Sequence, residues 1–272
     1  MSQAWQAIPP ARALILSLLS SGGTGPTALA ALTRMGGLFG VDAATIRVAV
    51  GRLARDGLLE QVERGQYALG ARGAAMGARV RGWRQAEARM KGWDGGWLLI
   101  LVDHLGRADR VRLRARERAL RLSGFAQSDA GFWARPDNLA APLPQLIAEA
   151  VDLGLDAAAI AFASAAPLPD EEAKLRTLWS ADNLATTYRF WVDAMDTSAA
   201  RVARMPPDEA ARETLLLGQA VIRAINLDPL LPDALVDAGL RRWMIDGMIA
   251  YDDIGRRAWA AFGTVEVRSD QG

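Results

Sequence analysis

The chain has 272 residues, with 32 Lys or Arg against 31 Asp or Glu, a net charge of +1 and no cysteine. The lack of cysteine excludes disulfides, thiolate metal sites and cysteine nucleophiles. Its longest apolar runs, such as WLLILV at 97–102, are too short to cross a bilayer, so we expect a cytoplasmic protein with no membrane partner. The length predicts two or three domains, and 51% hydrophobic residues are enough to give them cores.

The first two predicted elements are helices separated by a turn. Residues 11–22 (ARALILSLLSSG) carry leucines and an isoleucine at helical spacing, which predicts one buried stripe. The turn-rich sequence SSGGTGPT at 20–27 ends this helix. Thr27 is the expected N-cap of the second helix, which runs through TALAALTRMGGLFG at 27–40.

The third predicted helix lies within VDAATIRVAVGRLARDG at 41–57 and has two distinct faces. Asp42 is its expected N-cap, and Gly57 is expected to end it in the left-handed conformation. From Ile46 to Leu53, apolar residues recur at i, i+3, i+4 and i+7, which predicts a buried face. The arc away from this face carries Thr45, Arg47, Val48, Arg52 and Arg55.

Residues 58–70 (LLEQVERGQYALG) predict a two-stranded hairpin that turns near Glu63–Gly65. Three helices followed by a hairpin is the order of a winged helix-turn-helix. In such domains the recognition helix enters the major groove, while the hairpin contacts the minor groove or the backbone. The predicted DNA-binding residues are therefore Thr45, Arg47, Val48, Arg52, Arg55 and Arg64. Which arginines read bases and which bind phosphates stays open.

The charge is unevenly distributed along the chain. Residues 1–91 hold 12 Lys or Arg and 5 Asp or Glu, a balance of +7, so the remainder carries −6. A basic domain joined to an acidic body favours a polyanionic partner for the first part. Two alternatives stay open: such a domain also serves as a protein-interaction module, and an arginine-bearing helix is often only a solvated surface.

The rest of the chain predicts a change of architecture. Residues 71–95 are basic and glycine-punctuated, which is typical of a linker helix. Residues 96–168 alternate strands and helices, with strands expected at 97–104, 125–136 and 158–165 and helices at 109–124 and 143–154. This order predicts a ferredoxin-like domain with its helices on one face of the sheet. Residues 169–272 predict a helical C-terminal domain, so the whole chain is expected to be α+β, with the winged helix at 1–70.

Two features are candidates for binding a small effector. The densest positive run, Arg107 to Arg118, suits the phosphates of a CoA-type ligand or forms an ordinary solvated helix face. Aromatic residues recur through the helical part, where they line a cavity or, as is more usual, form core. With both alternatives open, the predicted effector-binding residues are Arg112, Arg116, Trp133 and Trp191.

The sequence predicts no enzyme, no cofactor and no metal site. His104 is the only histidine, so a centre with two histidine ligands is impossible, and its place at a strand end fits a structural role. The chain has no G-x-S-x-G elbow, and GGTGPT at 22–27 lacks the Lys-Ser/Thr of a phosphate-binding loop. The pairs Glu171–Glu172 and Asp252–Asp253 are sequence neighbours, so on a helix they do not face each other.

Three collinear stretches resemble the PaaX-like transcriptional regulators, the repressors of phenylacetic acid degradation. ATIRVAVGRLARDGLLE at 44–60 resembles the recognition helix of that family. LSGFAQSDAGFWARP at 122–136 is similar to its middle motif through Gly124, Phe125, Gly131, Trp133 and Pro136. The segment DPLLPDAL at 228–235 resembles its C-terminal signature through Asp228, Pro229, Leu231, Pro232 and Leu235.

The resemblance implies a homodimeric repressor that binds a palindromic double-stranded operator and is released by a small effector, an aryl-CoA thioester in the best-known branch. This sequence departs from the family pattern at two places. Leu58 stands where a tryptophan is expected after the recognition helix, and the hairpin GQYALG at 65–70 has none of the additional basic residues expected there. Operator sequence and effector identity stay open.

Overall fold

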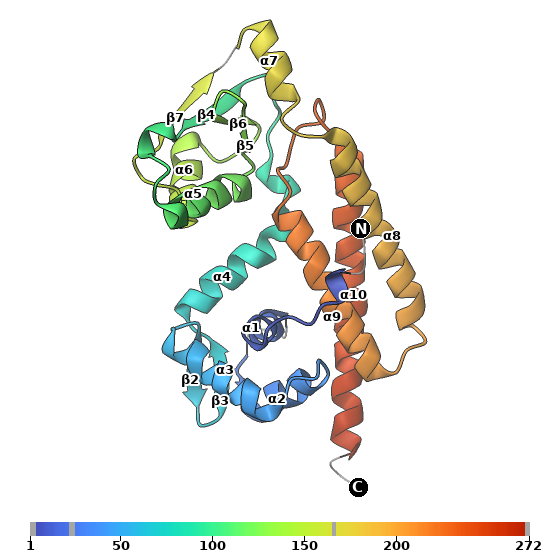
Figure 1. Cartoon of the computed structure of the whole chain (residues 1–272). Helices are drawn as coiled ribbons and strands as arrows, with labels where there is room; N and C mark the ends of the chain where they lie inside the picture. Colours follow the sequence, from blue (N-terminus) through green and yellow to red (C-terminus); the bar gives the residue numbers. More distant parts are fainter. Residues whose placement is uncertain (1–3, 22–24, 165–166, 270–272) are drawn as a thin grey trace. The chain divides into compact units, whose positions relative to one another are not determined.

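The structure is a computed structural model that describes residues 4–21, 25–164 and 167–269 (Figure 1). It combines helices with two small antiparallel sheets, which confirms the predicted α+β class. The chain forms two compact units, each built from separate chain segments. The first unit comprises Met1–Trp83, Val192–Arg223 and Asp246–Gly272, and the second comprises Arg84–Trp191 and Ala224–Ile245. The predicted division at residues 70, 95 and 168 stays a prediction.

The first unit begins with three helices and a small sheet. The helices are α1 (Ala11–Ser21), α2 (Leu29–Gly37) and α3 (Ala43–Arg55), and the strands are β1 (Thr27–Ala28), β2 (Leu59–Glu63) and β3 (Gln66–Leu69). The sheet has the order β1-β3-β2, with both pairs antiparallel. The expected sequence of three helices and a hairpin is therefore present, with one strand added.

The added strand corrects the expectation for Thr27. Thr27 pairs with Tyr67 in the sheet, and the N-cap of α2 is Ala28, whose side chain makes no capping hydrogen bond. The backbone N–H of Leu29 donates instead to the carbonyl of Gly65 in the hairpin turn, 2.8 Å away. The start of α2 is thus fixed by the hairpin and not by a threonine side chain.

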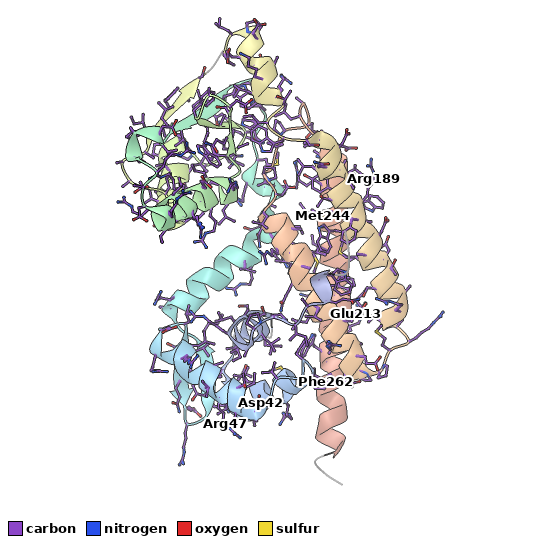
Figure 2. The ribbon with its side chains drawn as sticks, viewed as in Figure 1. Asp42, Arg47, Arg189, Glu213, Met244 and Phe262 are labelled. Carbon is purple, nitrogen blue, oxygen red and sulfur yellow. The ribbon has the colours of Figure 1, made fainter. Side chains whose placement is uncertain are left out.

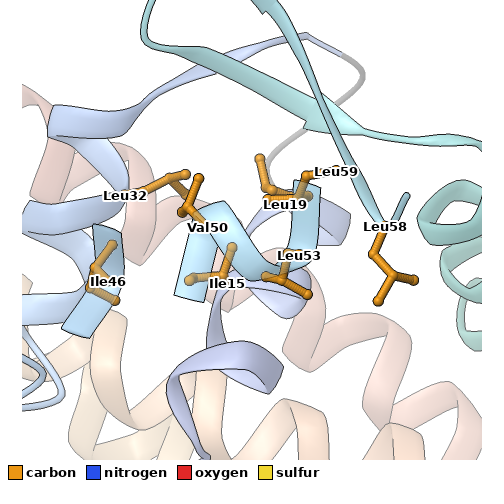
Figure 3. Close-up of a cluster of buried hydrophobic side chains, with 8 residues drawn as sticks. All are labelled: Ile15, Leu19, Leu32, Ile46, Val50, Leu53, Leu58 and Leu59. Atoms are coloured by element: carbon orange, nitrogen blue, oxygen red, sulfur yellow. The ribbon is translucent and has the colours of Figure 1, made fainter. Parts of the chain in front are cut away.

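A cluster of aliphatic side chains holds these elements together (Figure 3). It is formed by Ile15, Leu19, Leu32, Ile46, Val50, Leu53, Leu58 and Leu59, none of which is more than 6% exposed. Burial of one such side chain contributes about 1.5–3 kcal/mol. The cluster therefore fixes α3 against α1, α2 and the first hairpin strand.

Residues 71–89, within the predicted linker, form α4 (Ala71–Arg81) and the short 3₁₀ turns η2 (Gly82–Gln85) and η3 (Glu87–Arg89). The first turn of α4 lies close against the base of the hairpin. A Cβ at Gly73 would collide with the carbonyl oxygen of Leu58, so this approach requires glycine.

The long helices α8 (Ala181–Val202), α9 (Pro207–Asn226) and α10 (Ala238–Ser269) each belong partly to both units. Within the first unit, Leu215 and Leu216 of α9 pack with three buried side chains of the N-terminal region. Those side chains are Leu14, Leu18 and Phe39, and Trp259 of α10 packs against the same cluster. Helix α1 and the end of α2 with its following turn therefore share a core with α9.

The second unit contains a four-stranded antiparallel sheet with the order β5-β6-β4-β7. Its elements are β4 (Trp97–Leu101), the 3₁₀ turn η4 (Asp103–Leu105), α5 (Arg110–Leu122), β5 (Ala126–Gln127), β6 (Trp133–Pro136), α6 (Leu143–Asp152) and β7 (Ile160–Ser164). All of these strands and helices lie within the predicted ranges. Helices α5 and α6 contact each other beside the sheet (Figure 1).

Aromatic side chains fill the core beside this sheet. Trp97 is fully buried and stacks on Trp179, with ring centroids 6.3 Å apart, while Trp93 meets it edge to face at 5.5 Å. Leu175 of the short helix α7 (Pro169–Arg176) packs in the same cluster. Trp179 therefore packs against the core while it stays partly exposed.

Two of the stretches that carry the family resemblance contact each other within the second unit. Asn138 Nδ2 donates to the carbonyl of Leu230 at 2.6 Å, and Arg135, whose pKa burial lowers to about 10, donates to the carbonyls of Ser123 and Pro229. Gly124 has a φ of +78°, and a Cβ there would lie 3.0 Å from the carbonyl oxygen of Pro229. The glycine in one stretch thus makes room for the proline in the other.

Candidate nucleic-acid interface

Helix α3 is fixed at both ends by the residues that the sequence predicts. The Oδ1 of Asp42 accepts a hydrogen bond from the backbone N–H of Thr45 at 2.9 Å, and Oδ2 accepts from the Thr45 hydroxyl at 2.7 Å. These bonds lower the pKa of Asp42 below its ordinary value. Gly57, with a φ of +69°, follows the C-cap residue Asp56. Both predicted ends are confirmed.

The two faces of α3 also match the prediction. Ile46, Val50 and Leu53 are at most 1% exposed. The other arc is solvent-exposed along its length, from Thr45 through Arg47, Val48 and Arg52 to Arg55. In Figure 2, Asp42 and Arg47 mark the N-terminal half of this helix. Val48 leaves 53% of its surface exposed in spite of its apolar side chain. An apolar residue kept on the surface between two arginines suits a partner that offers methyl groups beside acceptors.

The exposed arginines of α3 differ in their contacts. Arg55 Nε lies 3.4 Å from the carbonyl of Gly51 in its own helix. Among the side chains that the structure describes, neither Arg47 nor Arg52 has an ion-pair partner. The nearby carboxylate Asp56 is already paired with Arg12, at 2.7 Å. Two guanidinium groups on one exposed face are thus left available to an anion or a base edge.

The hairpin offers less positive charge than the helix. Arg64 is exposed at the turn between β2 and β3, where Gly65 has a φ of +76°. Glu60 and Glu63 on β2 are also exposed. A single arginine flanked by two carboxylates gives the hairpin a weak attraction for phosphate, so the stronger candidate contact surface is α3.

The four predicted effector-binding residues lie in different environments of the second unit. Arg116 is 3% exposed and donates to Asp156 at 2.8 Å and to the carbonyls of Gly106 and Val102 at 3.2 and 3.4 Å. Arg112 also pairs with Asp156 but keeps 68% of its side chain exposed. Trp133 is buried beneath the guanidinium of Arg121, 5.5 Å from its ring centroid, and Trp191 is half-buried beside Phe190.

Because of these contacts, the four side chains differ in how available they are to bind an effector. Burial raises the pKa of Asp156, but hydrogen bonds from Arg112 and Arg116 outweigh it and hold that pKa below its ordinary value. Arg116 donates its hydrogen bonds to Asp156 and to two backbone carbonyls. It therefore holds α5 against the loop before β7. Arg112 alone of the four presents a largely exposed charge. The effector assignment of all four stays a prediction.

A shallow groove in the first unit lies between the end of α2 and the start of α9. It is lined by Arg34, Gly37, Leu38, Asp208, Glu209, Arg212 and Phe262. The groove carries both charge signs and an aromatic wall, and it contains none of the four predicted effector residues. Its lining comes from the region of α2, α9 and α10, which also contributes to the cluster around Leu215 and Leu216.

The described residues form no cluster of metal ligands, since no three His, Asp or Glu side chains are grouped among them. His104 Nε2 lies 3.0 Å from the carbonyl of Ala158, which ties the turn after β4 to the loop before β7. Within the same ranges, no helix is both long enough and apolar enough to span a membrane.

Comparison with known proteins relates the chain to a protein family and to solved structures. Residues 10–73, from α1 to the start of α4, match the family model described as PaaX-like protein. This match confirms the predicted resemblance over that segment. No curated protein matches the chain. The structure of the uncharacterized protein Rv0674 from Mycobacterium tuberculosis is similar over 91% of this chain and 98% of its own, with 24% identity and a TM-score of 0.59, which shows a shared fold.

Proposed function

We propose, from the likeness of residues 10–73 to PaaX-like proteins, that this chain is a DNA-binding transcription regulator of the cytoplasm. We interpret α1 to β3 as a winged helix-turn-helix, with α3 as the recognition helix and the β2–β3 hairpin as the wing. The order of helices and the β1-β3-β2 sheet support this interpretation. We likewise interpret β4 to β7 as a ferredoxin-like sheet, supported by its β-α-β-β-α-β order.

One observation carries the proposal: Arg47 and Arg52 are exposed, without a partner in the described chain, on the outward face of a helix capped at both ends. A guanidinium group binds guanine O6 and N7, or a phosphate, through paired donors. Thr45 and Val48 lie on the same arc, within reach of a thymine methyl or the backbone. Arg55 and Arg64 are assigned to phosphate contacts, because they lie at the end of α3 and at the wing tip.

The first experiment measures binding to DNA upstream of the chain's own gene and its neighbours. The Arg47→Ala/Arg52→Ala variant is expected to lose most of the operator affinity. Arg204→Ala/Arg223→Ala is the matched control, because it removes two exposed arginines of the same unit that lie outside residues 10–73. Equal, weak binding by the wild type and both variants would contradict the proposal.

Single variants separate base reading from phosphate binding. If Arg52 reads guanine, Arg52→Ala is expected to cost about 1–3 kcal/mol at one base pair and to relax sequence preference there. If it binds phosphate, all sequences weaken alike. Binding to operators substituted at each position distinguishes these outcomes.

We further propose that the regulator is a homodimeric repressor of a catabolic operon, which a small effector releases from a palindromic operator. Two recognition helices then lie about 34–36 Å apart, one turn of DNA. The core that α9 shares with α1 and α2 supports a ligand response, since a shift of α9 would change the packing behind the recognition helix. The resemblance favours an aryl-CoA thioester or a related aromatic metabolite as effector.

The effector proposal is tested by adding aryl-CoA thioesters to the protein–operator complex. Release at constant salt, with a raised melting temperature of the free protein, is expected for a true effector. The alternative function is a protein-interaction module that uses the same surface for docking. A flat dependence of the binding constant on salt would favour that alternative, because phosphate contacts make DNA affinity fall steeply.

A further inference from the structure

A row of three arginines follows the exposed face of α5 in the second unit. Arg110, Arg114 and Arg118 are spaced four residues apart, so successive Cα atoms rise by about 6 Å along one side of the helix. All three are solvent-exposed, and Val111 beside them is 80% exposed. We call these three residues the α5 row.

The other arginines of the same helix have internal partners, and the α5 row has none among the described residues. Arg112 and Arg116 pair with Asp156, while Arg121 lies 3.6 Å from Glu117 and over the ring of Trp133. Wherever the structure describes the chain, no carboxylate pairs with the α5 row.

Three like charges at i, i+4 and i+8 repel one another and destabilise the helix that carries them. A solvated helix face usually mixes charges of both signs, but Glu117, the one acidic residue of α5, pairs with Arg121 and not with the row. The repulsion is relieved when an anion with repeated charges binds along the row. The geometry therefore indicates an extended polyanion.

The rest of α5 is anchored in a way that keeps the row on the surface. Leu120 and Ala119 are fully buried, and Arg116 is fixed to Asp156 and to two backbone carbonyls. Asp109 caps the helix by accepting hydrogen bonds from the N–H groups of Val111 and Arg112. A rigid helix presents the three guanidinium groups in a fixed line about 12 Å long.

We propose that the α5 row binds the sugar-phosphate backbone of duplex DNA, independently of sequence, as a contact of the second unit in addition to that of α3. This inference rests on the proposed function. Duplex DNA carries one phosphate per about 1.7 Å of axis, so a row of this length lies opposite several phosphates. Phosphate contacts of this kind position a protein on the duplex but read no sequence.

The chemistry of the row favours DNA over a small phosphate ester or an anionic membrane. A small phosphate ester binds best in a concave site that covers most of its surface, whereas the row lies on an exposed helix face. An anionic membrane is bound by an amphipathic helix with an apolar face, and Val111 is the only exposed apolar residue beside the row.

The test compares salt dependence in two full-length triple variants. Arg110→Gln/Arg114→Gln/Arg118→Gln removes the row. Arg189→Gln/Arg204→Gln/Arg242→Gln removes three exposed arginines from α8, α10 and the turn after α8, also without ion pairs in the described ranges (Arg189 is labelled in Figure 2). Binding is measured from about 50 to 200 mM salt, on operator DNA and on an unrelated duplex of equal length.

Loss of the row is expected to reduce the slope of log K against log salt by up to about 2.7, at about 0.9 per phosphate contact. Operator and unrelated DNA should weaken by the same factor, so their affinity ratio is preserved. The control variant should change the slope much less. The row variant should melt at the same or a higher temperature, because like-charge repulsion is removed.

Failures of the two proposals are distinguishable. If the wild type binds DNA with a steep slope and both triple variants behave alike, the α5 row proposal is overturned and the recognition helix stands. If the wild type shows no salt-dependent binding, the proposed function itself fails. Should the triple variant not fold, Arg114→Gln alone is expected to lower the slope by about 0.9, and an unchanged slope would overturn the proposal.

Discussion

Asp42 makes two contacts with one neighbour at the start of α3. One carboxylate oxygen accepts from the backbone N–H of Thr45, and the other accepts from its hydroxyl. The hydroxyl proton of Thr45 is therefore used inside the protein. In the proposed complex, Thr45 offers DNA its methyl group and its remaining acceptor capacity, so contact with a thymine methyl is favoured over a hydrogen bond to a phosphate oxygen.

Removal of this cap is expected to loosen α3, the proposed recognition helix. Asp42→Ala should lower the melting temperature and weaken operator binding, because the first turn of α3 loses its capping acceptor. Since its folded pKa lies below the ordinary value of 3.8, the charge of Asp42 stabilises the fold above that value. This contribution is lost as the pH falls through the lowered pKa.

Thermal unfolding of the wild type and Asp42→Ala from neutral pH down to about pH 3 checks this expectation. The difference in melting temperature should shrink toward the acid end. Asp42→Asn keeps a capping oxygen and is the matched control, which should retain most of the stability near neutral pH. A difference between wild type and Asp42→Ala that is constant across the range would contradict the assigned role of the charge.

At the scale of elements, the second unit depends on a contact between two distant segments. Gly124 follows α5 and meets the turn at Pro229, while Arg135 and Asn138 donate to carbonyls of the same turn. Asp228 closes the turn by accepting from the N–H of Leu230 and from the hydroxyl of Tyr188. These bonds give a structural reason for the two motifs to occur together.

Gly124→Ala is expected to destabilise the second unit by more than the backbone term alone. An alanine at a φ of +78° costs about 1–2 kcal/mol, and its Cβ would lie 2.8 Å from Arg135 and 3.0 Å from the carbonyl of Pro229. Gly51→Ala is the control, since Gly51 is helical with open space around it and alanine there stabilises by up to about 1 kcal/mol. Denaturant unfolding measures the free energy of unfolding of both variants. Equal changes in this free energy would contradict a stabilising role for the contact between Gly124 and Pro229.

The elements of the fold were largely predictable, because most of them carry a periodic local pattern. Strand β1 was not, since two residues contain no pattern and pair with a strand nearly forty residues away. The burial of Arg116 also could not be predicted from the sequence. Within a run of arginines it resembles its neighbours, and only the position of Asp156, forty residues later, distinguishes it from the exposed Arg114.

The same limit applies to the candidate site. The exposed arc of α3 follows from helical spacing and a local cap, so the positions of Thr45 to Arg55 were predictable. The α5 row was visible only as part of a longer basic run. The structure shows which arginines of α5 pair with Asp156 or Glu117. The three arginines of the row are those left without a carboxylate partner among the described residues.

At the scale of the molecule, the first unit is discontinuous in sequence. Its N-terminal helices bury Leu14, Leu18 and Phe39 against Leu215 and Leu216, which come from the other end of the chain. The segment that matches PaaX-like proteins therefore lacks part of its core when it is considered alone.

A fragment of residues 1–90 is accordingly expected to be less stable than the same helices in the full chain. Three apolar side chains would face water, and each uncovered side chain costs about 1.5–3 kcal/mol. Circular dichroism and hydrogen exchange on the fragment and the full chain check this. Leu216→Ala in the full chain should reproduce part of the loss, by about 2–5 kcal/mol. A fragment that melts at the temperature of the full chain would contradict the prediction.

This shared core has a consequence during protein synthesis. Phe39 leaves the ribosome long before Leu216, and at about 5–20 residues per second the interval is roughly nine to thirty-five seconds. During that time the nascent helices expose Leu14, Leu18 and Phe39, an apolar surface prone to aggregation that is covered only when the last third of the polypeptide has been made. A chaperone that holds the emerging chain would raise the yield of folded protein, and a message truncated before α9 would yield only an unstable fragment.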